Sequence, residues 1–166
     1  MTNRLRFLSV VVGRLTIQLK GQELDEQSLP RELKYSVIVN HRRVGEISFF
    51  EFNWPSIAVH QPFVFVWGGS RLFCLSSETG ELRTLLEDRD EILALYPLTQ
   101  GWCIVGETSL EVYDESFSEC KQSLGLDEII LESWWEDGKL YLRDLEERVI
   151  RIEPENGHVR LCESRG

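Results

Sequence analysis

One pattern of strands and turns is repeated three times in this sequence, and it constrains the fold more than any other feature. Each copy contains a short apolar strand, a polar turn, a second strand, a second turn and a third strand. The copies run over residues 63–86, 102–124 and 140–162. Leu72, Leu110 and Ile150 fall at equivalent places, so the period is roughly 38 to 40 residues, which is typical of repeat proteins.

A further apolar run precedes each copy and supplies a fourth strand to each unit. These runs cover residues 56–59, 92–96 and 129–131. Within the strands apolar side chains recur at every second position, which places Leu72 and Cys74 on one face of their strand, and likewise Leu110 and Val112. This alternation is typical of a sheet that is covered on one face.

The turns between the strands support the same repeat. Gly80 and Gly157 stand where hairpin turns need a residue that tolerates positive φ. The middle copy has Phe117-Ser118 at this place, which predicts a turn of another type or length. The sequence therefore predicts three four-stranded antiparallel units between residues 53 and 166.

This spacing resembles the blades of β-propellers of the WD40 or quinoprotein type. The resemblance covers about residues 53–163 and includes segments such as Leu110-Glu111-Val112-Tyr113-Asp114 followed by a polar turn. It implies a propeller-like architecture and assigns no functional residues, since no strand ends in a Trp-Asp dipeptide. Propellers host many unrelated activities, so the resemblance does not choose among functions.

Residues 1–52 also hold about four predicted strands, but their turns do not match the repeat. We therefore expect a small N-terminal β-layer laid against the blades, with a degenerate fourth blade as the alternative. Asn53-Trp54-Pro55 marks the junction, because proline interrupts the hydrogen-bond ladder of a sheet. The predicted organisation is an N-terminal β-region of residues 1–52 and a three-repeat propeller-like domain of residues 53–166.

Charge is distributed unevenly along the chain, whose formal net charge is −10. Residues 1–52 carry eight Lys and Arg against six Asp and Glu, whereas residues 53–166 carry ten against twenty-two. Nucleic acid is disfavoured as a partner, because phosphate contacts need a basic face. The acidic repeats either attract a basic protein or simply keep a β-rich chain soluble.

Familiar catalytic, cofactor and metal motifs are missing from the sequence. The three histidines, His41, His60 and His158, show no ligand spacing, and no P-loop, G-x-G-x-x-G or G-x-S-x-G run occurs. Paired acids such as Asp127-Glu128 read as solvated loops, although a carboxylate pair across a cleft could serve a hydrolase. We predict no catalytic residue, no cofactor and no metal.

The cysteines and the apolar segments bear on the compartment. Cys74, Cys103, Cys120 and Cys162 each fall in a predicted strand, so we expect small core residues in a reducing compartment, with a disulfide between blades as the alternative. No run resembles a signal peptide or reaches the length of a membrane span. The expected location is cytoplasmic.

The tryptophans supply the candidate site. Trp134 and Trp135 are adjacent, so on a strand one of them must point away from the core, and Glu136 and Asp137 follow directly. An exposed tryptophan ringed by acids would anchor a basic segment through packing and cation–π attraction. We predict a partner-binding site at these four residues, with Trp67 as the second choice.

These features favour a non-enzymatic protein-interaction module, of the adaptor or inhibitor type, that presents an acidic, Trp-bearing β-surface to a protein with a basic patch. Two alternatives stay open. One is a binder of small ligands or carbohydrates, or a hydrolase that uses acidic residues. The other is a structural subunit of a larger assembly, and a homodimer that closes the ring of blades is a further possibility.

Overall fold

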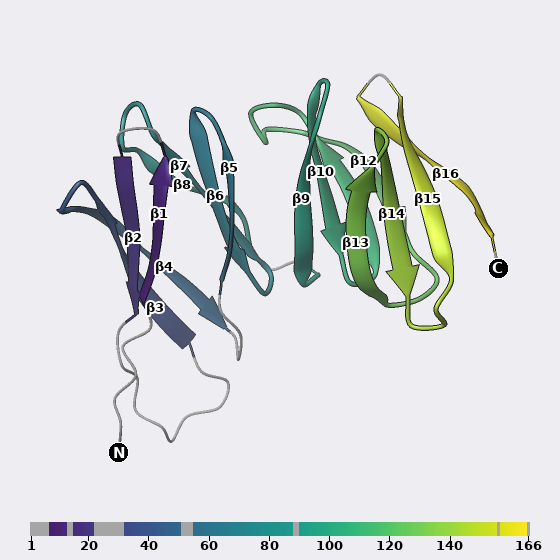
Figure 1. Ribbon diagram of the computed structural model, residues 1–166, viewed down its shortest axis with the longest axis horizontal. Helices are drawn as coiled ribbons and strands as arrows, with labels where there is room; N and C mark the ends of the chain where they lie inside the picture. The colour runs from purple at the N-terminus through teal and green to yellow at the C-terminus, as the bar shows by residue number, and fades with distance from the viewer. Residues whose placement is uncertain are drawn as a thin grey trace, which may run out of the picture. The chain divides into compact units, whose positions relative to one another are not determined.

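The structure, a computed structural model, describes residues 7–12, 15–21, 32–50, 55–87, 90–155 and 157–165. In this part of the chain the regular structure is entirely β-strand. Sixteen strands form four four-stranded antiparallel sheets, in which each strand pairs with the next along the chain (Figure 1). The chain divides into two compact units, Met1–Arg89 and Asp90–Gly166, with two sheets in each. The prediction of an all-β fold is confirmed.

The first sheet corrects the prediction for the N-terminal region. Its strands are β1 (Phe7–Val12), β2 (Leu15–Gly21), β3 (Glu32–Val39) and β4 (Arg42–Phe50). They form the same meander as the other sheets, so the preferred β-layer is wrong and the alternative of a fourth blade describes the region. The turns concealed this likeness, because Asn40 and His41 adopt φ values of 47° and 66° without the glycine of the repeats. The junction residues Asn53 and Trp54 lie outside the described residues.

The second sheet matches the first predicted copy closely. Its strands are β5 (Ser56–His60), β6 (Phe63–Gly68), β7 (Arg71–Ser76) and β8 (Leu82–Leu86). Leu72 and Cys74 are buried on one face, but Phe73 and Leu75 on the other face are buried as well. The central strands of this sheet are therefore covered on both faces, which a single-face alternation does not predict.

The core of the first unit lies between its two sheets. It contains Ile17, Leu19, Tyr35, Val37, Ile47 and Phe49 from the first sheet and Val64, Val66, Phe73 and Leu75 from the second. The rings of Phe49 and Phe73 meet edge to face, with centroids 5.4 Å apart. Because alternate positions of β2, β3 and β4 supply this core, the N-terminal strands show the period of two expected for a half-covered sheet.

The second unit contains the third and fourth sheets. The third is built from β9 (Ile92–Leu98), β10 (Gly101–Gly106), β11 (Ser109–Tyr113) and β12 (Cys120–Gly125). The fourth is built from β13 (Ile130–Glu136), β14 (Lys139–Asp144), β15 (Val149–Glu155) and β16 (His158–Arg165). Leu72, Leu110 and Ile150 each lie on the third strand of their sheet, as the predicted period requires. Pro154 lies within β15.

An apolar core and a pair of hydrogen bonds join the two sheets of this unit. The core contains Cys103, Val105, Leu110 and Val112 from the third sheet and Ile130, Leu140, Leu142, Ile152 and Val159 from the fourth. Between the edge strands β12 and β16, Gln122 Nε2 donates a hydrogen bond to the carbonyl oxygen of Val159 at 2.9 Å. Val159 N donates to Gln122 Oε1 at 2.8 Å, so one side-chain amide pairs with the backbone of β16 as a strand would.

The four cysteines are free and differ in exposure. Cys74 and Cys103 are core residues as predicted, and burial raises the pKa values of their thiols to about 11 and about 12. Both thiols therefore stay protonated at neutral pH. Cys120 is exposed and Cys162 is half-buried, so the prediction of core residues is wrong for Cys120.

The boundary between the two compact units differs from the predicted domain boundary, because the two boundaries separate different things. The division between Arg89 and Asp90 separates pairs of packed sheets. The predicted division into residues 1–52 and residues 53–166 separates a non-repeating sequence from a repeating one, and it stays a prediction.

Candidate functional site

The two adjacent tryptophans lie near the end of β13 and point to opposite faces of the fourth sheet. The predicted strand ended at Leu131, but the structure continues it to Glu136. Trp135 pairs with Leu140 across the β13–β14 hairpin and so belongs to the face that carries the core. Trp134 pairs with Tyr141 and belongs to the other face, which we call the outer face.

Trp134 is half-buried in a stacked aromatic pair. Its ring and that of Tyr141 are 12° from parallel, with centroids 5.5 Å apart. The next residue in the same row across the sheet is Arg151 on β15, followed by Cys162 on β16. Trp134 is therefore one member of a continuous row of side chains. Its ring leaves less surface for contact with a partner than the sequence suggested.

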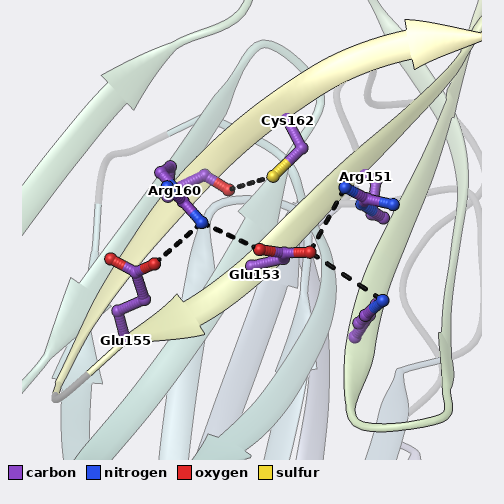
Figure 2. A network of polar contacts seen from close by, with 6 residues as sticks. Arg151, Glu153, Glu155, Arg160 and Cys162 are labelled. Atoms are coloured by element: carbon purple, nitrogen blue, oxygen red, sulfur yellow. Dashed lines mark hydrogen bonds and ion pairs between the residues drawn. The ribbon is translucent and has the colours of Figure 1, made fainter.

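Beside this row the outer face carries a network of ion pairs centred on Glu153 (Figure 2). Arg160 Nη2 lies 3.0 Å from Glu153 Oε2, and Arg151 Nη2 lies 3.3 Å from Oε1. Lys139 Nζ is 3.8 Å from the same carboxylate, and Arg160 also pairs with Glu155 at 3.0 Å. The Arg160 hydrogen bond, together with the nearby positive charges, holds the pKa of Glu153 below its ordinary value.

The outer face is balanced in charge among the side chains that the structure describes. Its four carboxylates and four cations are Glu132, Glu136, Glu153, Glu155, Lys139, Arg143, Arg151 and Arg160. Arg143 completes the set by pairing with Glu132. Exposed ion pairs of this kind stabilise a fold only slightly, but they leave little net charge to attract a basic partner.

Trp135 offers a better anchor than Trp134. Its side chain is 40% exposed, yet its ring stacks on Tyr96 of β9 with centroids 5.8 Å apart and planes 28° from parallel. The Tyr96 hydroxyl in turn shares a hydrogen bond of 2.9 Å with Ser133 Oγ. An exposed tryptophan held in one orientation loses little conformational entropy when a partner covers it.

Glu136 and Asp137 follow Trp135 directly in the chain and are both exposed, but Glu136 belongs to the outer face of the sheet. Asp137 and Gly138 form the two-residue turn of the β13–β14 hairpin, with φ values of 49° and 72°. Asp-Gly is a strong sequence signal for such a turn, and it could have placed this hairpin in advance. Trp67, the second choice, lies in the other unit on β6 and is 8% exposed, so it presents almost no surface.

A second surface of the same unit lies at the other end of the β13–β14 hairpin, where several connections meet. Glu107 N donates to Glu91 O, Ile130 N donates to Glu107 O, and Leu126 N donates to Thr108 O. These hydrogen bonds join the start of β9, the β10–β11 turn and the β12–β13 connection. The carboxylates gathered here are Asp90, Glu91, Glu107, Asp127, Glu128, Asp144, Glu146 and Glu147.

Burial and the crowding of negative charge at this end both affect the pKa of Glu91. Partial burial raises the pKa of Glu91, and the neighbouring carboxylates of Glu107 and Asp90 raise it further. Asp144, by contrast, is fully buried, yet hydrogen bonds from Arg148 and from the backbone hold its pKa below its ordinary value. The second unit as a whole carries seven Lys and Arg against eighteen Asp and Glu.

This crowding predicts a pH dependence that a single variant removes. A raised pKa in the folded state means that ionising Glu91 costs more there than in the unfolded chain. Its contribution to stability is therefore greatest below its ordinary pKa of 4.5 and falls as the pH rises through the folded value. Glu91→Gln should unfold at higher urea concentration than the parent at about pH 7, with a much smaller difference at about pH 4.

Glu78→Gln in an exposed turn of the first unit provides the matched control. If Glu91→Gln lowers stability at neutral pH, or shifts it equally at both pH values, the crowded-carboxylate explanation is wrong.

No arrangement for metal binding or membrane insertion is found in the part of the chain that the structure describes. Within those residues no group of three or more His, Cys, Asp or Glu side chains could hold a metal ion. No described helix is long and apolar enough to cross a membrane. Neither finding bears on the choice between a binding module and an enzyme.

Four meandering four-stranded sheets define the class as a propeller-like β-protein. No family model matches the chain, and no curated protein matches it. Among solved structures it is similar to the N-terminal domain of Nup159, with a TM-score of 0.55 and 14% identity over 90% of this chain and 41% of that chain.

It is also similar to a chain in the S. cerevisiae complex of a Dbp5 variant with Nup159, a Gle1 variant, IP6 and ADP. That match has a TM-score of 0.56 and 13% identity, and it covers 90% of this chain and 40% of the other. This chain thus spans about two-fifths of the length of both. At such identity the likeness shows the fold alone, which supports the propeller-like prediction and leaves the WD40 type undecided.

Proposed function

We propose that this chain is a non-enzymatic protein-interaction module whose second unit binds a basic patch of a partner protein. The contact surface consists of Trp135, Glu136 and Asp137 at the tip of the β13–β14 hairpin, with Tyr96 as the support of the tryptophan ring. The observation that carries the proposal is that Trp135 is 40% exposed while its ring is stacked on Tyr96.

Physical reasons favour this surface for a basic partner. Tryptophan anchors are enriched at the energetic centres of protein interfaces, and a lysine or arginine can also lie over the indole face. Asp137 lies in the hairpin turn and Glu136 lies on the outer face of the strand end, so their exposed carboxylates add attraction for a cationic segment that approaches the hairpin. Trp134 stacks on Tyr141 on the charge-balanced outer face, where its role is to hold β13 in place rather than to contact the partner.

The comparisons support the general class of function without naming the partner. The S. cerevisiae structure to which this chain is similar is a complex of several proteins. A propeller-like fold serves such assembly by presenting loops and strand ends on a rigid scaffold. For this chain we propose an adaptor or inhibitor role in the cytoplasm that needs no cofactor and does not involve nucleic acid.

The proposal predicts a local response of Trp135 to a cationic peptide. An oligolysine peptide added to the full isotope-labelled chain should shift the indole N–H signal of Trp135, which Trp135→Phe identifies in the spectrum. An oligoglutamate peptide should leave it in place. The double variant Trp135→Ala, Glu136→Lys should weaken the oligolysine contact at this hairpin by about tenfold or more.

Trp134→Phe serves as the matched control, because it keeps an aromatic ring against Tyr141 on the outer face. It should retain the response of Trp135. If the hairpin signals respond equally in the double variant, or do not respond in the parent chain, this surface is not the binding site.

A further inference from the structure

Three aliphatic side chains are exposed together at the base of the β13–β14 hairpin. Ile129, Leu131 and Leu145 are 41%, 52% and 56% exposed, and we call them the aliphatic patch. Leu145 N donates to Ile129 O at 2.8 Å, which places two of them side by side. Leu131 lies in a β-bulge, where the register of β13 shifts between Ile130 and Glu132. A bulge re-aims a side chain, and here it brings leucine to the surface.

The backbone under the patch is held firmly. Ile130, which separates two patch residues, is 2% exposed, and its N–H donates to Glu107 O at 2.7 Å. On the other side of the patch the buried carboxylate of Asp144 accepts from Glu146 N and Arg148 N, both at 2.9 Å, and from Arg148 Nε at 2.7 Å. The patch is therefore a preformed surface, and a partner that covers it would not have to order it first.

Acidic side chains surround the aliphatic patch. Asp127 and Glu128 immediately precede it in sequence, and Glu146 and Glu147 immediately follow it. Arg148 neutralises part of this charge by pairing with Asp144 at 2.7 Å and Glu146 at 3.4 Å. The carboxylates at this end of the β13–β14 hairpin outnumber Arg143 and Arg148, the cations that pair with them. Partial burial, and then the neighbouring carboxylates of Glu107 and Asp90, raise the pKa of Glu91 at the same end.

We propose that the aliphatic patch is a second docking surface, which binds a segment of a partner protein in which aliphatic side chains alternate with lysine or arginine. Exposed apolar side chains grouped on a fixed backbone are typical of protein-binding surfaces. The charge around them selects the partner, because a second copy of this chain would bring the same negative charge against it. Nucleic acid and anionic lipid are disfavoured for the same reason.

This inference goes beyond the function proposed above, because it uses different residues at the opposite end of the same two strands. The Trp135 hairpin offers one aromatic anchor for a cation, whereas the aliphatic patch offers an apolar surface surrounded by acidic side chains. The second unit thus has two separate places at which basic segments dock, and each can be removed without touching the other.

The test is calorimetric titration of the full chain with a synthetic peptide of alternating leucine and lysine. The matched peptides of alternating leucine and glutamate and of alternating serine and lysine should bind at least about tenfold more weakly, because each lacks one half of the complementarity. Binding of the leucine–lysine peptide should also weaken as salt is added.

Leu131→Ser combined with Leu145→Ser should weaken binding of the leucine–lysine peptide by about tenfold. Leu161→Ser is the matched control, since Leu161 is 43% exposed on β16 of the same unit and should leave binding unchanged. The variant Trp135→Ala, Glu136→Lys should also keep this binding, which separates the patch from the hairpin surface. Amide shifts of Ile129, Leu131 and Leu145 in the unmodified chain report the contact without any substitution.

Three results would overturn the proposal. The double serine variant could bind as tightly as the parent, or the leucine–glutamate peptide could bind as tightly as the leucine–lysine peptide. The parent chain could also form a dimer that the double serine variant abolishes, which would make a second copy the occupant.

Discussion

Leu142→Ala is expected to lower the free energy of unfolding by about 2–5 kcal/mol. Leu142 lies in the middle of β14 with none of its surface exposed, and it belongs to the core between the third and fourth sheets. Truncation removes contacts on every side and leaves a cavity that rigid flanking strands cannot fill. Because both sheets of the second unit supply this core, we expect the whole unit to lose stability.

Urea unfolding followed by circular dichroism measures the effect. Leu131→Ala removes the same atoms from a side chain that is 52% exposed, and its effect should stay within about 0.5 kcal/mol. Equal destabilisation by the two variants would mean that the fourth sheet does not pack through the face that carries Leu142.

The repeated part of the fold could be predicted from the sequence because its signals are local. Apolar side chains at alternate positions and glycine at the turns define strands and hairpins within a few residues. Gly80 and Gly157 indeed adopt φ values of 73° and 79°. The middle turn, which lacks glycine, places Phe117 at a φ of 59° and compensates by stacking its ring on Trp102 and Tyr113.

The N-terminal sheet could not be recognised as a blade, because recognition depended on turn chemistry rather than on strand pairing. The four strands were largely found, but the turn at Asn40 and His41 lacks the glycine that marks the turns of the repeats at Gly80 and Gly157. What makes the sheet blade-like is that its strands pair in chain order and bury one face against the second sheet. Both properties depend on tertiary contacts, so they cannot be read from local patterns in a single sequence.

Part of the geometry around the two tryptophans could be predicted from the sequence. Adjacent tryptophans on a strand must face opposite ways, and this argument correctly separated Trp134 from Trp135. The argument missed Tyr141 and Tyr96, which stack on them from β14 and from a different sheet. It also missed the aliphatic patch, since Leu131 appeared to be an ordinary strand residue until the bulge turned it outward.

Gly101→Ala should be among the most damaging single substitutions in the second unit. Gly101 begins β10 with a φ of 117°, a conformation that side chains rarely adopt. A Cβ at this position would lie 2.0 Å from the carbonyl oxygen of Tyr113, which is backbone and cannot rotate away. Conformational strain and collision act together, so we expect a loss of about 3 kcal/mol or more in the free energy of unfolding.

Gly125→Ala provides the matched control, because a Cβ there meets nothing within 4 Å and its φ is not in the left-handed region. That substitution should change stability by less than about 1 kcal/mol, and it would raise stability if it only restricts the unfolded chain. The two variants, compared by urea unfolding, separate the general effect of losing a glycine from the specific need at the β9–β10 turn. If Gly101→Ala is as stable as Gly125→Ala, then β10 does not approach Tyr113 as closely as the structure places it, and the register of β10 and β11 is wrong.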